Sequence, residues 1–523
     1  MGDASEASPL IEELIHQFTD PFAFYRELIQ NSIDAGSSRI EVTLSYRPSP
    51  AGLGLCLATV ADWGEGMSRD VIENYLVTKF RSTKQDDFTK IGKFGIGFVS
   101  VFACQPDAVA VDTGRDGQSW RVLFKKSTAW ELLALGEPVE GTRVALHKEM
   151  SAADYDAFVA RSLDAVKRWC RHSEADVVFA AGGRDGGPPP PPEAVKEPFV
   201  VDAPYQVEHH EEGTHIIAGP SRASEPLTGF YNRGLTLLET TERHLDGVAL
   251  KIVSRYLEHT LTRDNVKREK NFARAMALAK KLATGPLLAA LPEELKKAAD
   301  RKDGAADWLT LFSFALSRLE PSKLWLRQTG GGAVSFEEVR RSLGKQRELV
   351  ISLEPTPLVE RMRLAGSVVL ELSLGRPLQA LKALVRAKEI AVAEQRFTYA
   401  EPPVAPQPPG FASAVVSLLT TAGAKVKDAM VAEVRGAAKD EPFVVLEAPG
   451  RPAHADEARA SPFSRRAPGL LVFNHAHPSI AAAEPLFARA PRLAAVLMGR
   501  LVLVRSSKLD DAADRRLTEW ALT

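Results

Sequence analysis

The chain has 523 residues, which is too long for one hydrophobic core, so about two to four domains are expected. Hydrophobic residues make up 45% and charged residues 25%, as in an ordinary globular protein. The net charge of -1 provides no global field for nucleic acid or an acidic membrane surface, and no apolar stretch of about eighteen residues predicts a membrane span.

The cysteine pattern and the N-terminal segment indicate the compartment. Cys56, Cys104 and Cys170 are far apart and odd in number, so they predict neither a disulfide framework nor a zinc cluster. The segment MGDASEASPL is acidic and has no apolar core, so it is not a secretory signal. We therefore expect a cytoplasmic protein.

Two stretches rich in Gly and Pro divide the chain. AAGGRDGGPPPPP and EPPVAPQPPG cannot sustain a helix or a central strand. We expect four segments: a first domain, a linker, a second domain and a third domain, over residues 1–180, 181–194, 195–400 and 401–523.

Local sequence patterns predict helices and strands in the last two of these domains. The second opens with strand-like FVV and THIIA and turns helical over residues 271–300. The third holds a helical run near residues 412–438, strand-like FVVLEA and GLLVF, and a helical tail.

The segment PFAFYRELIQNSIDAG has apolar residues at helical spacing and a natural stop at Gly36. At 100° per residue, Glu27, Asn31 and Asp34 fall within about 60° of one another. Two carboxylates and an amide thus share one helix face. A solvated face is the alternative interpretation.

Two strands follow this helix. RIEVTLSYRP alternates strictly, and LGLCLATVAD leads into DWGEGM. Asp62 stands where the second strand ends, and a carboxylate there can accept a hydrogen bond from an adenine amino group. Gly64 and Gly66, followed by Met67, let the backbone approach a flat ligand closely. A tight turn capped by Asp62 is the alternative.

A third glycine cluster lies in KIGKFGIGFVSVF, which has neither the Rossmann nor the Walker spacing. Its glycines, Gly92, Gly95 and Gly97, precede what reads as a helix start, where free N–H groups would cradle phosphate oxygens. GTRVAL then predicts a turn and strand that bring Thr142 into the same pocket.

Taken in order, ELIQNSIDA, DWGEGM, GKFGIGF and GT resemble the GHKL superfamily of ATPases. Among these, the sequence is most similar to the ninety-kilodalton heat-shock chaperones, both in RSTK at Arg81–Lys84 and in RHSEADVVF at Arg171–Phe179. The resemblance implies an α+β fold, with a Bergerat-type ATP-binding sandwich, an α/β middle domain and a small, mostly helical C-terminal domain.

The resemblance also implies roles by position. Glu27 would be the general base that orients water, restrained by Arg26, and Asp34 would be structural. Asn31 would complete the Mg²⁺ shell. Asp62 would bind adenine, with Thr142 helping through a water. The remaining residues would line the base pocket or hold phosphates through backbone amides: Gly66, Met67, Gly92, Gly95, Ile96, Gly97 and Phe98.

The resemblance continues more weakly into HLDGVALKIVSRYLEHTLTRDNVK. Arg263 matches the family arginine that reaches the γ-phosphate, and Lys267 matches a second phosphate-sensing position. Thr260 departs from the Asn of the family pattern, which places the loop geometry in doubt. A solvated basic cluster is the alternative.

Further along, ELVISLEPTPLVERMRLAGSVVLEL resembles the later strand–helix–strand unit of the middle domain. LLVFNHAHPSI and the following helices are similar to a trimmed dimerisation domain. Two departures stand out. The exchanged N-terminal strand of the family is missing before LIEELIHQF, and the lid stretch between Met67 and Gly92 is short.

HHEEGTH, at His209–His215, misses the zinc motif H-E-x-x-H by one residue. Its position beside Gly213 favours the tip of a hairpin over a metal site.

The sequence therefore predicts a homodimeric, ATP-driven clamp of the stress-response chaperone type, which hydrolyses Mg-ATP slowly and acts on client proteins. Dimerisation is expected through the last domain, because LAAVLMGRLVLV lacks an obvious intrachain cover. Nucleic acid and membrane partners are not expected. The alternatives are a nucleic-acid-acting GHKL ATPase of the mismatch-repair or chromatin-remodelling kind, and a module that binds ATP as a structural switch.

Overall fold

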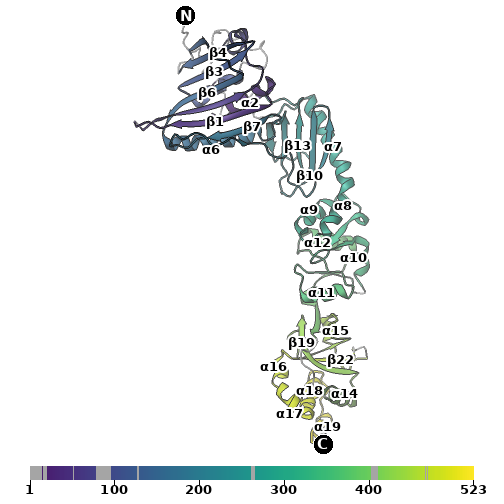
Figure 1. Cartoon of the computed structure of the whole chain (residues 1–523). Helices are drawn as coiled ribbons and strands as arrows, with labels where there is room; N and C mark the ends of the chain where they lie inside the picture. The colour runs from purple at the N-terminus through teal and green to yellow at the C-terminus, as the bar shows by residue number, and fades with distance from the viewer. Residues whose placement is uncertain are drawn as a thin grey trace. The chain divides into compact units, whose positions relative to one another are not determined.

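The computed structural model describes residues 15, 20–50, 52–77, 96–125, 129–260, 265–344, 346–401, 410–465, 467 and 469–522. The chain forms two compact units, Met1–Leu287 and Leu288–Thr523 (Figure 1). Among the helices of the described residues, none is long and apolar enough to cross a membrane.

The first unit is built on an eight-stranded sheet with the order β5-β4-β3-β6-β2-β1-β7-β8. Neighbouring strands are antiparallel, except for the parallel pair β1 and β7. The strands are β1 Arg39–Arg47, β2 Gly54–Asp62, β3 Ala108–Arg115, β4 Gln118–Lys125, β5 Trp130–Ala134, β6 Gly141–Met150, β7 Asp176–Ala181 and β8 Glu193–Ala194. The alternation predicted for β1 is confirmed, since every second residue from Ile40 to Tyr46 is buried.

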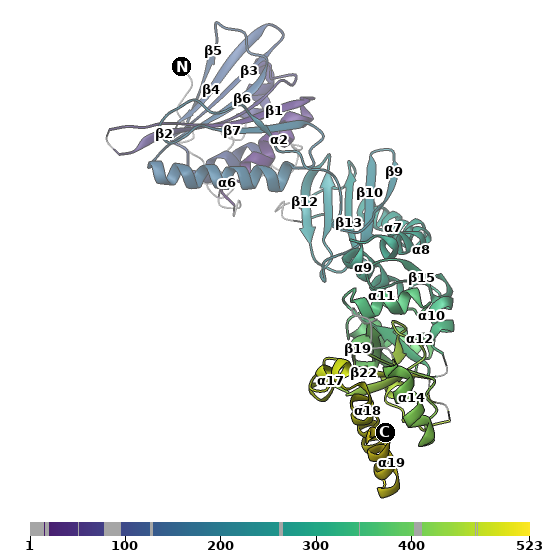
Figure 2. The same ribbon diagram turned by 60° about the horizontal axis from the view of Figure 1, so that its bottom comes forward.

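Helices pack on this sheet and enclose its core. Both views place α6 along β1 and β7 (Figures 1 and 2). Its first turn is capped by the Ser151 hydroxyl, which accepts from the Asp154 amide. Helix α2 packs against α6 and confirms the helix predicted from PFAFYRELIQNSIDAG. The helical elements are α2 Phe24–Asp34, α3 Arg69–Val71, the π-helix Ile72–Leu76, α5 Ile96–Val99, the 3-10 helix Ser100–Cys104 and α6 Ala152–Cys170.

A second sheet in the same unit has five strands in the order β12-β11-β13-β10-β9. Helix α7, Lys270–Thr284, packs against β9, β10 and β13. The strands are β9 Val207–Glu211, β10 Thr214–Pro220, β11 Thr228–Asn232, β12 Leu235–Thr240 and β13 Val248–Ser254. The THIIA strand is confirmed as β10, whereas the prediction of a strand at FVV is wrong, because residues 199–201 have no ladder partner.

The turn that follows α6 joins the two sheets through buried polar groups. Lys251 on β13 lies 2.9 Å from Nε2 of His172, whose Nδ1 lies 3.3 Å from the carbonyl oxygen of Glu197. Nε2 therefore accepts from the ammonium group, and Nδ1 carries the proton. Arg171 pairs with Glu239 on β12. These contacts anchor the second sheet to the end of the first.

The second unit begins with a helical region. Helix α8 follows α7 after Gly285, so the helical stretch predicted over residues 271–300 is two helices. Short strand pairs β14–β15 and β16–β17 lie between the helices. The elements are α8 Pro286–Asp300, α9 Ala305–Ala315, the 3-10 helix Pro321–Lys323, β14 Trp325–Arg327, β15 Ala333–Ser335, α10 Phe336–Ser342, β16 Glu348–Ile351, α11 Pro357–Leu364, α12 Arg376–Val385, β17 Glu389–Val392 and α13 Ala393–Arg396.

The last part of the chain packs helices on a five-stranded sheet with the order β20-β22-β19-β18-β21. The helical run predicted near residues 412–438 is wrong in its second half, which forms β19. FVVLEA and GLLVF are confirmed as strands. The elements are β18 Phe397–Glu401, α14 Phe411–Thr421, β19 Asp428–Gly436, β20 Phe443–Leu446, β21 Ala453–His454, α15 Ala455–Ala458, β22 Leu470–Asn474, α16 Pro478–Ala481, α17 Glu484–Arg489, α18 Pro491–Arg505 and α19 Asp511–Leu522.

Helix α18 corrects the expectation that LAAVLMGRLVLV lacks intrachain cover. It packs against α14, α17 and α19, and most of its apolar side chains are buried. Leu493, Leu497 and Val504 remain 42%, 39% and 53% exposed. Their i, i+4 and i+11 spacing places them on one stripe of the helix.

Candidate functional site

A cavity of about 350 Å³ opens between α2 and the eight-stranded sheet. Its walls come from α2, β2, β3, β6 and the segment that includes the π-helix, an element often found at functional sites. The cavity brings together residues predicted from four separate motifs: Asn31, Asp62, Gly66, Met67, Phe98 and Thr142.

Helix α2 presents Leu28, Asn31, Ser32 and Ala35 to the cavity, at the i, i+3, i+4 and i+7 spacing of one helix face. The helix ends where Gly36 adopts a φ of 77°. Apolar and polar side chains thus line the same wall. Of the three polar residues predicted to share a helix face, Glu27 is buried, Asn31 is half-buried and Asp34 is exposed.

Asp62 is the buried charge of the cavity, with 7% of its surface exposed. Its Oδ2 accepts from the Ser32 hydroxyl at 2.8 Å, and its Oδ1 accepts from the Gly64 amide at 2.9 Å. A carboxylate offers about four acceptor positions, so two remain. Asp62 can therefore accept a further hydrogen bond from a ligand in addition to these two.

Thr113, which sequence reasoning missed, contacts two residues that line the cavity, Met67 and Thr142. It is fully buried on β3, where its Oγ1 accepts from the Met67 amide at 2.8 Å. The same oxygen lies 3.0 Å from Oγ1 of Thr142 and donates to the Gly141 carbonyl at 3.0 Å. Thr113 therefore positions both Met67 and Thr142. In the strand AVAVDTG, Thr113 is a polar residue at a position where alternation places the side chain in the core, and this pattern could have revealed it.

Gly66 and Gly141 let the backbone close around the cavity. Their φ angles are 64° and 69°. A Cβ at Gly66 would meet the Gly114 carbonyl oxygen at 2.1 Å, and one at Gly141 would meet the Asp62 carbonyl oxygen at 2.1 Å. Any side chain at either position would push the wall apart.

The proposed phosphate segment is described only from Ile96 onward. Helix α5 begins at Ile96, as predicted for a helix start in this stretch, and contains Gly97. Phe98 is buried against Phe102 and Phe124 and lines the cavity. Gly92, Gly95, Arg81–Lys84 and the Ile96 side chain lie outside the described residues.

Arg26 and Glu27 are buried on α2 one turn before Asn31, with 3% and 4% exposed, and neither lines the cavity. The Arg26 guanidinium lies 4.9 Å from the centre of the Trp169 ring. Burial lowers the pKa of Arg26 to about 10, so the group stays charged at neutral pH. A fixed cation thus adjoins the predicted general base in the sequence.

Arg263 lies outside the described residues, and His259 and Val266 pair on either side of the gap. Burial, followed by the charge of Arg26, lowers the pKa of His259. Lys267 is ion-paired with Glu258 at 3.1 Å.

Two ion pairs border the cavity. Asp34 meets Arg233, from the turn between β11 and β12, at 3.2 Å. Glu65 meets Arg115 at 3.2 Å. The first pair connects the end of α2 with the second sheet.

Comparison with known proteins points to one family for this region. A family model described as a histidine kinase-, DNA gyrase B-, and HSP90-like ATPase matches residues 23–134. Chaperone protein HtpG of a Polaromonas species is 28% identical over 183 residues, or 29% of this chain and 28% of that protein. HtpG of Vibrio campbellii is 31% identical over 182 residues, or 29% of this chain and 28% of that protein.

HtpG of Methylococcus capsulatus is 28% identical over 183 residues, with 27% of that protein covered. The chain thus spans a little over a quarter of the length of the curated relatives it matches. The family match covers α2, β2 and β3, which build the cavity around Asp62. Residues 23–134 therefore match the model of a GHKL-type ATPase domain, and the chain is similar to HtpG chaperones over about a quarter of their length.

Proposed function

We propose that this chain is an ATP-driven, chaperone-type homodimeric clamp, which hydrolyses Mg-ATP to change conformation around client proteins in the cytoplasm. The observation that carries the proposal is Asp62, a buried carboxylate with unused acceptor capacity at the wall of a cavity of about 350 Å³.

The cavity fits an adenine nucleotide chemically. Asp62 accepts a hydrogen bond from the adenine amino group, and the Thr142 hydroxyl, held by Thr113, contributes a second polar contact through a water. Gly66 and Met67 flank the base. Asn31 supplies an amide oxygen, the kind of ligand that suits Mg²⁺ beside phosphate oxygens.

Hydrolysis is assigned to residues around this cavity. Bound Mg-ATP supplies the phosphoryl group that passes to water. Glu27 orients that water as general base, and Arg26 restrains Glu27 until the active state forms. Gly92, Gly95, Ile96, Gly97 and Phe98 hold phosphates through backbone amides.

Arg263 stabilises the charge on the γ-phosphate, because its guanidinium is a planar, permanently charged donor. The charge of Arg26, which helps to lower the pKa of His259, is consistent with this assignment. A site completed by a second domain accounts for slow turnover.

Dimerisation is assigned to residues 401–523. The exposed stripe of Leu493, Leu497 and Val504 on α18 supports a contact with a second copy. Two chains joined there would each carry an ATPase domain, the arrangement that a clamp requires.

The test separates nucleotide binding from chemistry. Glu27→Ala should keep Mg-ATP affinity near that of the wild type in calorimetry while hydrolysis falls to background, because a base acts on water. The matched control is Glu131→Ala, which removes an exposed carboxylate paired with Lys125 and should hydrolyse ATP at the wild-type rate. Equal loss of affinity and turnover in Glu27→Ala would assign Glu27 a structural role and reject the mechanism.

A nucleic-acid-acting ATPase is the second candidate, and one observation favours it. In the second unit, a cavity of about 810 Å³ is lined by several cations and the carboxylate of Glu337. These cations are Arg340, Arg341, Arg347 and Arg386. Affinity purification with Glu27→Ala should recover protein clients. Salt-dependent recovery of nucleic acid, lost on replacing these arginines, would favour the second candidate.

A further inference from the structure

The hairpin of β9 and β10 carries three metal-ligating side chains on one face. His210 lies directly opposite His215, and Glu208 precedes His210 by two residues on the same strand. Because side chains alternate along a strand, all three project from the same face. Across the described residues, this is the one group of three His, Cys, Asp or Glu side chains whose ligand atoms lie within 4.8 Å of one another.

The two distances from the Glu208 carboxylate to the imidazole nitrogens are close to those around a tetrahedral ion. Oε2 of Glu208 lies 3.2 Å from Nε2 of His210 and 3.2 Å from Nε2 of His215. The two imidazole rings stack with their centroids 3.9 Å apart. Donors bound to Zn²⁺ at about 2.0–2.2 Å in a tetrahedron stand about 3.4 Å from one another. Small side-chain rotations would therefore place an ion between the three donors.

Neighbouring groups hold the ligands in place. Gln206 donates to Oε1 of Glu208 at 3.1 Å, which leaves Oε2 for the two imidazoles. The ring of Phe199 packs 5.0 Å from that of His215. The His215 side chain is 29% exposed and that of His210 is 65% exposed, so one side of the group is open to solvent. Outer contacts of this kind orient ligands in metal sites.

We propose that Glu208, His210 and His215 form a binding site for a divalent transition-metal ion, with Zn²⁺ as the expected occupant. Two imidazoles and a carboxylate suit Zn²⁺, and they leave a fourth position for water. Because β9 is the edge strand of its sheet, the bound ion ties this edge to β10. The site shares no residue with the nucleotide cavity, so it stands apart from the proposed ATPase function.

The experiment titrates ZnCl₂ into chelator-treated, tag-free full-length protein by calorimetry, without nucleotide. The wild type should bind one ion per chain. His210→Asn and His215→Asn should each weaken binding at least tenfold, because each removes one of three ligands. His209→Asn is the matched control: it lies next to His210 but faces the other side of the strand, and it should change affinity less than about threefold.

Glu208→Gln keeps the size of the side chain but removes its charge, and it should also weaken binding. Co²⁺ gives a second readout, because tetrahedral Co²⁺ absorbs strongly in the visible range. These bands should appear in the wild type and in His209→Asn and be lost in His215→Asn. The proposal is overturned if the wild type shows no saturable Zn²⁺ binding, or if His209→Asn loses as much affinity as His210→Asn.

Discussion

The two units each bury a charged side chain, and the two charges are satisfied differently. Asp62 in the first unit accepts two hydrogen bonds and faces a cavity. Arg327 in the second unit is 1% exposed and donates from every nitrogen of its guanidinium group.

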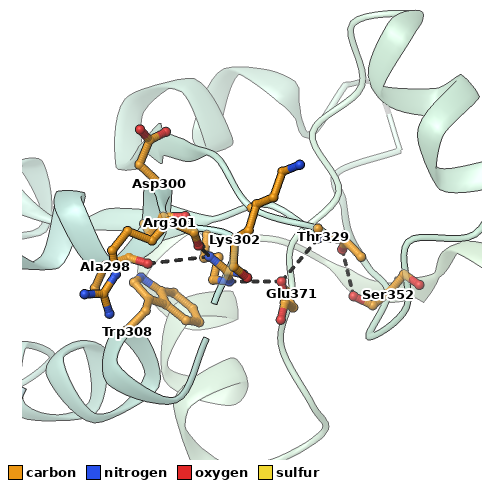
Figure 3. A network of polar contacts seen from close by, with 12 residues as sticks. Ala298, Asp300, Arg301, Lys302, Trp308, Thr329, Ser352 and Glu371 are labelled. Atoms are coloured by element: carbon orange, nitrogen blue, oxygen red, sulfur yellow. Dashed lines mark hydrogen bonds and ion pairs between the residues drawn. The ribbon is translucent and has the colours of Figure 1, made fainter. Parts of the chain in front are cut away.

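Each nitrogen of the Arg327 guanidinium donates a hydrogen bond. Its Nε donates to Glu371 at 3.0 Å, and its two Nη atoms donate to backbone carbonyls. Figure 3 shows the surrounding network of polar contacts, with Ala298, Lys302 and Glu371 labelled. These carbonyls belong to Ala298, Ala299, Arg301 and Lys302, at and just beyond the end of α8. Arg327 thus satisfies carbonyls that the end of a helix leaves without intrahelical partners.

The difference indicates how a buried charge can be assigned. All three nitrogens of a guanidinium can donate, and each nitrogen of Arg327 has at least one acceptor, so Arg327 serves the fold. A carboxylate with unused acceptor positions at a cavity can serve a ligand. The predictions below test this distinction, beginning with the largest expected effect.

Arg327→Met should destabilise the second unit by about 3–5 kcal/mol, because it removes the cationic partner of Glu371 and the buried hydrogen bonds to the carbonyls at the end of α8. Hydrogen exchange in α8 and β14 should accelerate, while ATP affinity stays unchanged. Arg340→Met is the control, since that arginine is exposed and paired with Glu337 at 3.3 Å; its cost should stay below about 1 kcal/mol. Similar losses in the free energy of unfolding for both variants would contradict the structural assignment of Arg327.

The His172–Lys251 contact should make the first unit sensitive to acid. Burial, reinforced by the charge of Lys251, lowers the pKa of His172 from 6.5 to about 4. Between these two pKa values, His172 is protonated in the unfolded chain and neutral in the folded chain. The free energy of unfolding is therefore unaffected by protonation of His172 above pH 6.5. It decreases as the pH falls toward 4, by up to about 3 kcal/mol.

Hydrogen exchange of β13 at about pH 7 and about pH 4.5, corrected for intrinsic rates, measures this loss. His172→Gln removes the titrating group and should flatten the dependence. A wild-type profile as flat as that of His172→Gln would show that the contact is not linked to protonation.

Asp62→Asn should lower ATP affinity at least tenfold, because an amide replaces a charge-assisted acceptor worth about 1.5–3 kcal/mol. Calorimetry measures the affinity, and thermal unfolding should change little, unlike that of Arg327→Met. Asp112→Asn, which removes a carboxylate paired with Arg121, is the control and should bind ATP normally. Unchanged affinity in Asp62→Asn would remove Asp62 from the site.

The sequence by itself determined the elements whose signals are local. The 3.6-residue period placed α2, strict alternation placed β1, and DWGEGM placed a carboxylate and glycines at the end of β2. These features depend on residues within a few positions of one another, so periodicity and turn chemistry reveal them.

Tertiary structure decided the features that depend on pairing between distant segments. Thr113 reaches Met67 and Thr142 only because β3 pairs with β6 in this register. HHEEGTH was compared with a helical zinc motif, yet the ligand atoms meet through strand alternation and cross-strand pairing. Register and burial are set by non-local contacts, because a shift of one residue would turn every side chain to the opposite face.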